Sequence, residues 1–122
     1  MKYYIILGHG SRNPESNQSI KSIAEMFQND RDEPVKHAFF QLAEPSLTKV
    51  IKDIVNKGGK TITIVPVFLF NGVHIKQDIP EVISEQQKKY PDISFELSEP
   101  IGDDPQLVDI LHKRANSAQK FD

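Results

Sequence analysis

The sequence predicts an α/β protein with a flavodoxin-like, three-layer α/β/α architecture and a four-stranded parallel sheet in the order 2-1-3-4. Short apolar runs alternate along the chain with longer segments whose apolar residues recur at helical spacing. Strands that alternate with helices of about 10–15 residues are typical of βαβ units, which build parallel sheets through right-handed crossovers. The strand order is predicted because it is common among folds of this kind.

Length and composition fit one soluble domain that spans residues 1–122. Of the 122 residues, 38% are hydrophobic and 26% are charged, which is ordinary for a globular domain with one core. The formal net charge of −2 argues against a general nucleic-acid-binding protein. Cysteine is absent, so disulfides, thiolate metal sites and a cysteine nucleophile are excluded.

Hydropathy indicates neither a membrane span nor a signal peptide. No apolar run approaches the ~20 residues that a transmembrane helix needs. The apolar residues near the N-terminus end at Gly8, too early for the core of a signal peptide. A cytoplasmic location without a membrane partner is therefore predicted.

The first half of the chain contains two predicted strand–helix pairs. An apolar run that ends at a glycine predicts the first strand, and Asn13 before Pro14 predicts a capped helix start. Aromatic residues favour the second strand, a proline marks the next helix start, and a glycine pair ends that helix. In order, these elements are the strand Tyr3–Leu7, the helix that begins at Pro14 and ends before Asn29, the strand Val35–Leu42, and the helix from Pro45 to Gly58.

The second half repeats the pattern. The β-branched run Thr61–Leu69 predicts a strand in which Pro66 causes a bulge or an early end of hydrogen bonding. Asn71–Gln77 is predicted to be a loop, and Asp78 to cap a helix that begins at Pro80. The remaining elements are the strand Ile93–Leu97, a helix that begins at Pro105 and buries Leu107, Val108, Leu111 and Ala115, and a frayed tail from about residue 116.

Two histidines are predicted to lie at the same crevice. In the order 2-1-3-4 the first and third strands are neighbours, and ligands bind where the chain leaves them in opposite directions. His9 follows the first strand and His74 follows the third, each close to a glycine. Imidazole binds first-row metals and accepts protons near neutral pH, so both residues are candidate ligands of a divalent metal in an open site. Glu44 adds a carboxylate after the second strand, or merely caps the following helix.

Other polar residues have weaker indications. His37 lies within a predicted strand and His112 within the last helix, and neither is expected to be a ligand. Arg12 and Lys76 flank the two candidate histidines and would attract an anionic substrate, or are simply solvated charges. The segment GHGSR lacks the third glycine of a dinucleotide-binding fingerprint and is not a Walker loop, and Ser11 has no nucleophile-elbow motif.

Four motifs in sequence order resemble the CbiX/SirB family of sirohydrochlorin chelatases, which are class II chelatases that need no ATP. They are ILGHGSR at 6–12, LAEPSL at 42–47, PVFLFNGVHIKQDIP at 66–80 and PIGDDPQL at 100–107. The resemblance implies a chelatase-like α/β fold in the short, single-domain form of the family. It also implies a lyase that inserts a divalent metal into sirohydrochlorin during cobalamin or siroheme biosynthesis. Cobalt is the first expectation, iron and nickel are the alternatives, and no tightly bound cofactor is implied because the metal is a substrate.

The same resemblance assigns roles to individual residues. His9 is expected to bind the metal and to accept protons from the pyrrole nitrogens, and His74 is the second metal ligand. The short form is expected to pair as a homodimer with a cleft between two copies. The residues expected to contact the tetrapyrrole are Gly10, Ser11, Arg12, Glu44, Leu69, Phe70, Asn71, Gly72, Val73 and His74.

Alternative functions are open to different degrees. A phosphoryl-transfer enzyme with a histidine nucleophile would need an arginine directly before the Gly-flanked histidine, and Leu7-Gly8 stand before His9. A phospho-acceptor signalling domain would need a cluster of acidic residues after the first strand, and the segment GHGSR has none. A non-enzymatic metal-binding or metal-carrier module would use the same two histidines without a tetrapyrrole cleft, and the residues leave this alternative open.

Overall fold

Strands and helices alternate along the whole chain. The computed structural model describes residues 1–70 and 72–121, without the side chains of Val73 and His74. The elements are β1 (Lys2–Gly8), α1 (Pro14–Asn29), β2 (Val35–Phe39), α2 (Leu47–Asn56), β3 (Thr61–Pro66), α3 (Val73–Lys89), β4 (Ser94–Leu97) and α4 (Pro105–Asn116).

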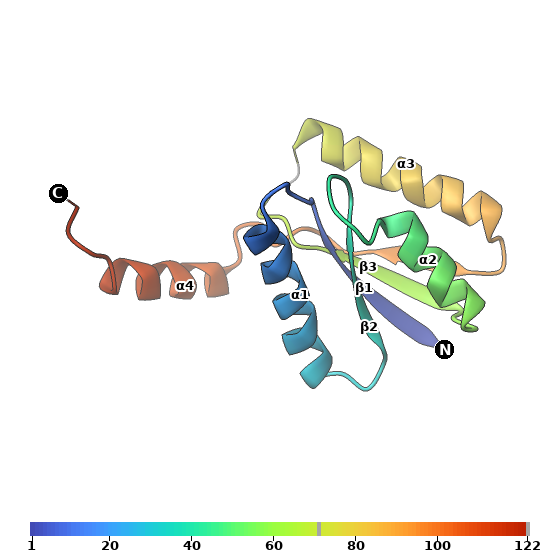
Figure 1. The fold of residues 1–122 in the computed structure, drawn as a ribbon, viewed down its shortest axis with the longest axis horizontal. Helices are drawn as coiled ribbons and strands as arrows, with labels where there is room; N and C mark the ends of the chain where they lie inside the picture. Colours follow the sequence, from blue (N-terminus) through green and yellow to red (C-terminus); the bar gives the residue numbers. More distant parts are fainter. Residues whose placement is uncertain (71, 122) are drawn as a thin grey trace.

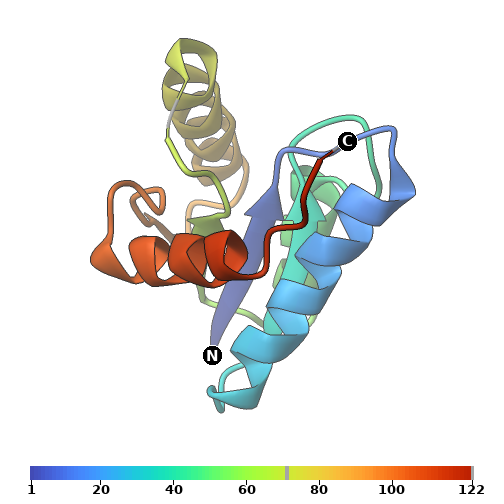
Figure 2. The same ribbon diagram turned by 90° about the vertical axis from the view of Figure 1, so that its left-hand side faces the viewer.

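The four strands form one parallel sheet in the order β2-β1-β3-β4, which confirms the predicted topology. Helix α1 packs on one face of the sheet, and α2 and α3 cover the other (Figures 1 and 2). Helix α4 extends away from these layers (Figure 1). Among the described residues, the helices lack the combination of length and hydrophobicity that a membrane span requires.

The main core lies between the sheet and the helices α2 and α3. Alternate residues of a strand point to opposite faces, so Ile5 of β1 and Ile62 and Ile64 of β3 all face α2. These side chains are completely buried, as is Ile54 of α2. The opposite face carries Tyr4, whose ring packs edge-on against Phe27 of α1 at 5.5 Å between centroids.

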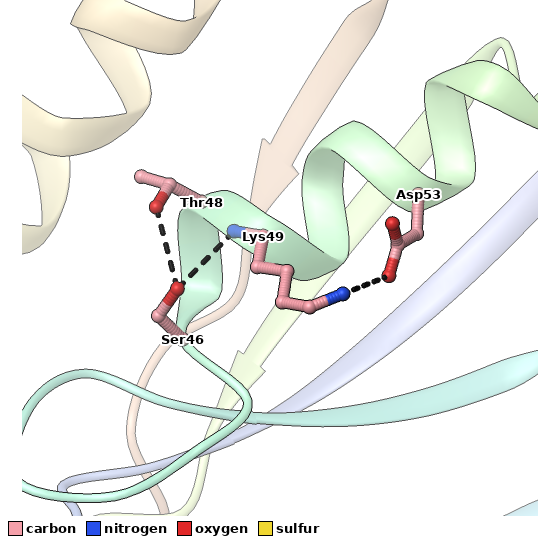
Figure 3. Close-up of polar contacts among 4 residues, drawn as sticks. All are labelled: Ser46, Thr48, Lys49 and Asp53. Carbon is pink, nitrogen blue, oxygen red and sulfur yellow. Dashed lines mark hydrogen bonds and ion pairs between the residues drawn. The ribbon is translucent and has the colours of Figure 1, made fainter.

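Helix α2 begins at Leu47, so the prediction that Pro45 opens it, with Glu44 as a possible cap, was wrong. Ser46 is the cap, and its hydroxyl oxygen accepts a hydrogen bond from the backbone N–H of Lys49 at 3.3 Å (Figure 3). The carbonyl of Pro45 accepts a hydrogen bond from the N–H of Phe39 at 2.9 Å, which keeps the preceding segment extended alongside β2. Beyond the cap, Lys49 and Asp53 form an ion pair one turn apart (Figure 3).

Two strands end earlier than their sequence patterns predict. β2 ends at Phe39 instead of Leu42, and β3 ends at Pro66 instead of Leu69. Pro66 lacks the N–H that would continue the ladder, and β3 ends there with one further bond to β1, from the Val67 N–H to the carbonyl of Leu7, so the early end was the correct alternative. The residues released from the strands become loops at the carboxyl edge of the sheet.

Helix α3 begins at Val73 and contains Pro80, so the prediction of a loop over 71–77 and a helix start at Pro80 was wrong. Gly72 takes the position before the first turn, and Asp78 lies inside the helix. A proline within a helix removes one hydrogen bond and is usually unfavourable. Here Ile79 is buried and Ile75 packs against the core, so apolar burial stabilises the turns that precede the proline.

Helix α4 begins at Pro105 with Asp104 as its cap, as predicted, but it has no buried face. Leu107 is half-buried, and Val108, Leu111 and Ala115 are exposed, so the prediction that these four residues face the core was wrong. The preceding loop is tied to the end of the sheet, because the N–H of Ile101 donates to the carbonyl of Phe68 at 2.8 Å. That attachment directs α4 outward from the carboxyl edge (Figure 1).

Acidification is expected to destabilise the fold through His37, which is half-buried in β2. Burial lowers the pKa of this imidazole below 6.5, and Lys21 lowers it further, whereas Glu25 opposes the shift. The neutral form is favoured by folding, so the stabilisation is full above the unfolded-state pKa and is lost as the pH falls through the folded-state pKa. Urea unfolding at about pH 7.5 and about pH 5 should show a larger loss for the wild type than for His37→Gln. Equal losses would contradict this role of His37.

Candidate functional site

The loops that follow β1 and β3 meet at the carboxyl edge of the sheet. Leu7 of β1 pairs with Pro66 of β3, and the N–H of Val67 donates to the carbonyl of Leu7 at 2.8 Å. The His9 ring consequently lies edge-on to the Phe68 ring, with 6.3 Å between their centroids. The predicted adjacency of these two loops is therefore confirmed.

The loop that carries His9 is anchored to the first turns of α1. The N–H of Ser11 donates to Asn17 Oδ1 at 3.0 Å, and Asn17 Nδ2 donates back to the carbonyl of Ser11 at 2.8 Å. The hydroxyl oxygen of Ser11 accepts from the N–H of Asn13 at 3.0 Å. Ser11 thus fixes the loop after β1, and Asn17, to which no sequence motif pointed, holds Ser11.

His9 is exposed, and both of its ring nitrogens have polar partners. Nδ1 lies 3.1 Å from the carbonyl oxygen of Gly10, and Nε2 lies 3.1 Å from the side-chain nitrogen of Gln41. Because a carbonyl oxygen only accepts, this geometry fits the tautomer with the proton on Nδ1, in which Nε2 accepts from the Gln41 amide. The lone pair of Nε2 is therefore held toward the loop after β2, where an exposed amide can be displaced by a stronger ligand.

Gly10 allows the loops after β1 and β2 to touch. Its φ is +98°, and a Cβ at this position would overlap the carbonyl oxygen of Gln41. The N–H of Gln41 donates to the carbonyl of His9 at 2.9 Å, and that of Phe40 donates to Gly8 at 2.9 Å. These bonds continue the β1–β2 pairing past the ends of the strands and fix His9 beside Gln41.

The other residues predicted at the site lie around this edge. Arg12 and Lys76 are exposed, as are the apolar side chains of Leu69 and Phe70. Glu44 is exposed and lines a hollow together with Pro14 and Lys21 of the α1 side. Gly72 precedes the first turn of α3, in which Val73 and His74 lie, and Asn71 and the side chains of Val73 and His74 are outside the described residues.

The donor set that the structure describes is small. Among the side chains that the structure describes, which do not include that of His74, no three His, Asp or Glu residues form a group that could hold a metal ion. Of the described imidazoles, that of His9 lies at the junction of the two loops. An open, exposed nitrogen ligand suits a metal that must be taken up and passed on, unlike a closed four-coordinate structural site.

Gln41 is the site residue that sequence reasoning missed. A loop glutamine has no distinctive motif, and the predicted strand Val35–Leu42 placed it inside an element. The signal that could have identified it is its position two residues past the end of β2, beside the loop that carries His9. Gly8 pairs with Phe39, so the same register carried forward places Gln41 opposite Gly10, the residue after His9.

Replacing Gln41 is expected to change the protonation pattern of His9 without unfolding the protein. The exposed amide of Gln41 is the partner of Nε2, so Gln41→Ala removes the bond that stabilises the Nδ1–H tautomer. Nitrogen-15 chemical shifts of the His9 ring should move toward a mixture of the two tautomers. Thr48→Ala, on the exposed side of α2, is a control that should leave the His9 shifts unchanged. Identical His9 shifts in Gln41→Ala and the wild type would contradict the assignment.

The model of the CbiX family matches residues 3–118. The chain belongs to the CbiX family. This CbiX-family chain is 31% identical to the sirohydrochlorin cobaltochelatase of Methanothermobacter thermautotrophicus, over 93% of its own length and 90% of the relative's. It is 35% identical to the chloroplastic sirohydrochlorin ferrochelatase of Arabidopsis thaliana, over 90% of its own length and 49% of the relative's.

A solved structure extends the comparison to three dimensions. The sirohydrochlorin chelatase SirB from Bacillus subtilis subspecies spizizenii, in complex with cobalt, superposes on this CbiX-family chain with a TM-score of 0.87 and 30% identity. The match covers 94% of this chain and 50% of SirB. The family resemblance expected from the four motifs is thereby confirmed, together with the fold that it implied.

Proposed function

We propose that this CbiX-family chain is an ATP-independent chelatase, a lyase that inserts a divalent metal into sirohydrochlorin. The observation that carries the proposal is the position of His9, an exposed imidazole held at the junction of the loops after β1 and β3. The relatives named as sirohydrochlorin cobaltochelatase and ferrochelatase support the same reaction class.

Insertion exchanges two pyrrole N–H protons for one divalent ion. The metal must lose water, two protons must leave the ring nitrogens, and the four nitrogens then close around the ion. A neutral His9 with its proton on Nδ1 offers Nε2 either as a metal ligand or as a base. Both roles require Gln41 to release Nε2, and an exposed side chain can do so at little cost.

The edge of the sheet has the surfaces that a carboxylated macrocycle requires. Leu42, Leu69 and Phe70 are 55%, 49% and 66% exposed and can cover a ring face. Arg12 and Lys76 supply positive charge for the peripheral carboxylates. We assign further ring contacts to the segment with Gly10 and Ser11, to Glu44, and to the segment 69–74.

His74 completes the proposed metal site as the second imidazole ligand. Its replacement in His74→Ala is expected to weaken Co²⁺ binding by at least about tenfold, because one of two strong nitrogen ligands is lost. Isothermal titration with Co²⁺ measures this directly, and His112→Ala, which removes an exposed histidine of α4, is the matched control. Unaltered Co²⁺ affinity in His74→Ala would exclude His74 from the site.

Cobalt is the proposed physiological metal, with iron and nickel as alternatives, because all three suit imidazole ligands and affinity order does not select among them. The metal is a substrate, and the proposal includes no tightly bound cofactor. We further propose that the protein is a cytoplasmic homodimer that works in cobalamin or siroheme biosynthesis.

Anaerobic absorbance of sirohydrochlorin tests the reaction. Purified protein is supplied in turn with Co²⁺, Ni²⁺ and Fe²⁺, against blanks without protein. Accelerated conversion of the free-base spectrum with at least one ion is expected, and the relative rates rank the metals. Folded protein that binds Co²⁺ but accelerates none of the three reactions would instead support the metal-carrier alternative.

A further inference from the structure

A hollow of about 240 Å³ lies between α1 and the edge strand β2, on the sheet face that α1 covers. Its lining comes from one side of α1, from β2 and from the loop after β2. The side chains concerned are Asn17, Gln18, Lys21, His37, Phe39 and Glu44. Except for Phe39 these side chains are polar, so the hollow suits a polar or charged group of a ligand.

The hollow shares a wall with the loop that carries His9. Asn17, which lines the hollow, exchanges two hydrogen bonds with Ser11 of that loop, at 3.0 and 2.8 Å. Phe39, at the inner side of the hollow, pairs in the sheet with Gly8, the residue before His9. The hollow is therefore a neighbour of the candidate site and lies on its α1 side. A ligand that binds at His9 can extend a side arm into it.

Lys21 brings an unpaired positive charge to the hollow. Neither of the two ion pairs that the described residues form includes Lys21. Its ammonium is thus paired neither with Glu44, which lines the same hollow, nor with Glu25, one turn further along α1. An ammonium that has no carboxylate partner within the protein attracts an anionic group of a ligand.

The electrostatic environment of His37 also favours an anion in the hollow. The charged groups around this imidazole are Lys21 and Glu25 of α1 and Glu44 of the loop after β2. Burial lowers the pKa of His37, Lys21 lowers it further, and Glu25 opposes the shift with a smaller effect. The charge of Lys21 therefore outweighs that of Glu25 at the ring. An anion beside the ring is stabilised by the same field that disfavours the imidazolium.

We propose that this hollow is an anchoring subsite for one peripheral carboxylate of the tetrapyrrole, held by the ammonium of Lys21 with the Gln18 amide and the His37 ring as further donors. The inference rests on the proposed function and adds a contact on the α1 side of the candidate site. Arg12 and Lys76 offer positive charge from the loop after β1 and from α3. A third charge on another side of the site restricts a ring with many carboxylates to fewer orientations.

Titration with metal-free sirohydrochlorin, followed by absorbance, tests the anchor. Lys21→Gln is expected to lower the affinity at least about threefold, because a charge-assisted contact is lost. Lys52→Gln removes an exposed ammonium of α2, on the other face of the sheet, and should bind like the wild type. Equal affinities of Lys21→Gln and the wild type would overturn the subsite and leave the chelatase proposal standing. A wild type that binds no sirohydrochlorin would overturn both.

Nuclear magnetic resonance titration of the His37 ring then locates the carboxylate. Saturation with metal-free sirohydrochlorin is expected to raise the pKa of His37, because a neighbouring anion favours the imidazolium. The rise should be smaller in Lys21→Gln, which has lost the anchor, and unchanged in Lys52→Gln. A pKa of His37 that stays the same when sirohydrochlorin saturates the wild type would show that no carboxylate enters the hollow, and would overturn the proposal.

Discussion

His9→Ala is expected to reduce the rate of metal insertion at least about 100-fold while leaving the fold intact. General base catalysis by a positioned side chain typically contributes a factor of about 10²–10⁴, and His9 is also the proposed metal ligand. The ring of His9 is exposed, and its described contacts are with Gly10, Gln41 and Phe68 at the edge of the sheet. Its removal creates no cavity in the core.

The measurement is the initial rate of sirohydrochlorin conversion at saturating Co²⁺, together with urea unfolding of the same preparation. His112→Ala serves as the matched control, because it deletes an exposed imidazole far from the loops after β1 and β3 along the chain. Both variants should unfold at the wild-type midpoint, and only His9→Ala should lose activity. Wild-type insertion rates in His9→Ala would remove His9 from the mechanism.

Gly10→Ala is expected to destabilise the protein by more than about 2 kcal/mol. A left-handed backbone conformation costs a residue with a Cβ about 1–2 kcal/mol, and Gly10 has a φ of +98°. A Cβ at this position would also overlap the carbonyl oxygen of Gln41. Relief of that overlap requires the loops after β1 and β2 to separate, which breaks the bond between the Gln41 N–H and the His9 carbonyl.

Gly58→Ala separates the conformational cost of a positive φ from the cost of the overlap with Gln41. Gly58 has a φ of +89°, but a Cβ there meets no atom within 4 Å. This variant should therefore show only the conformational cost of about 1–2 kcal/mol. Urea unfolding of both variants provides the comparison, with insertion activity as a second readout that Gly10→Ala alone should lose. Equal destabilisation by the two substitutions would show that the approach of Gly10 to Gln41 has no energetic consequence.

Local signals in the sequence were sufficient where they acted within one element. Asn13 and Pro14 fix the start of α1 through a side-chain cap and a preset φ, and both roles are present in the structure. Asp104 and Pro105 do the same for α4. The β-branched run of β3 and the early end at Pro66 also follow from residue type alone.

Local signals were misleading where a contact from elsewhere in the chain prevailed. Pro45 looks like a first helical residue, but its carbonyl is bonded to Phe39, so the helix begins after Ser46. Pro80 looks like a helix start, but burial of Ile79 and packing of Ile75 stabilise the turns before it. In both cases a tertiary contact outweighed the preference of a single proline.

The candidate site likewise has one feature that the sequence predicts and one that depends on tertiary contacts. The position of His9 next to the loop after β3 followed from the strand order, because the carboxyl ends of neighbouring parallel strands meet at one edge. Its pairing with Gln41 did not follow, since it depends on the ladder that continues from Gly8–Phe39 into the loops. Side-chain hydrogen bonds of this kind depend on register, which a glutamine in a loop does not reveal.

The sequence by itself determined the α/β class, the caps of α1 and α4, and the family to which the chain belongs. These features rest on periodicity, turn chemistry and motifs, which are readable along the chain. The order of the strands was predicted from its frequency among such folds, and the structure confirmed it. Only the tertiary structure decided which amphipathic faces are buried. Leu111 of α4 and Ile54 of α2 occupy similar apolar stripes, yet Leu111 is 57% exposed and Ile54 is fully buried. The reason is physical: periodicity specifies that a face is apolar, whereas the path of the chain around Ile101 and Gly102 specifies what that face can reach.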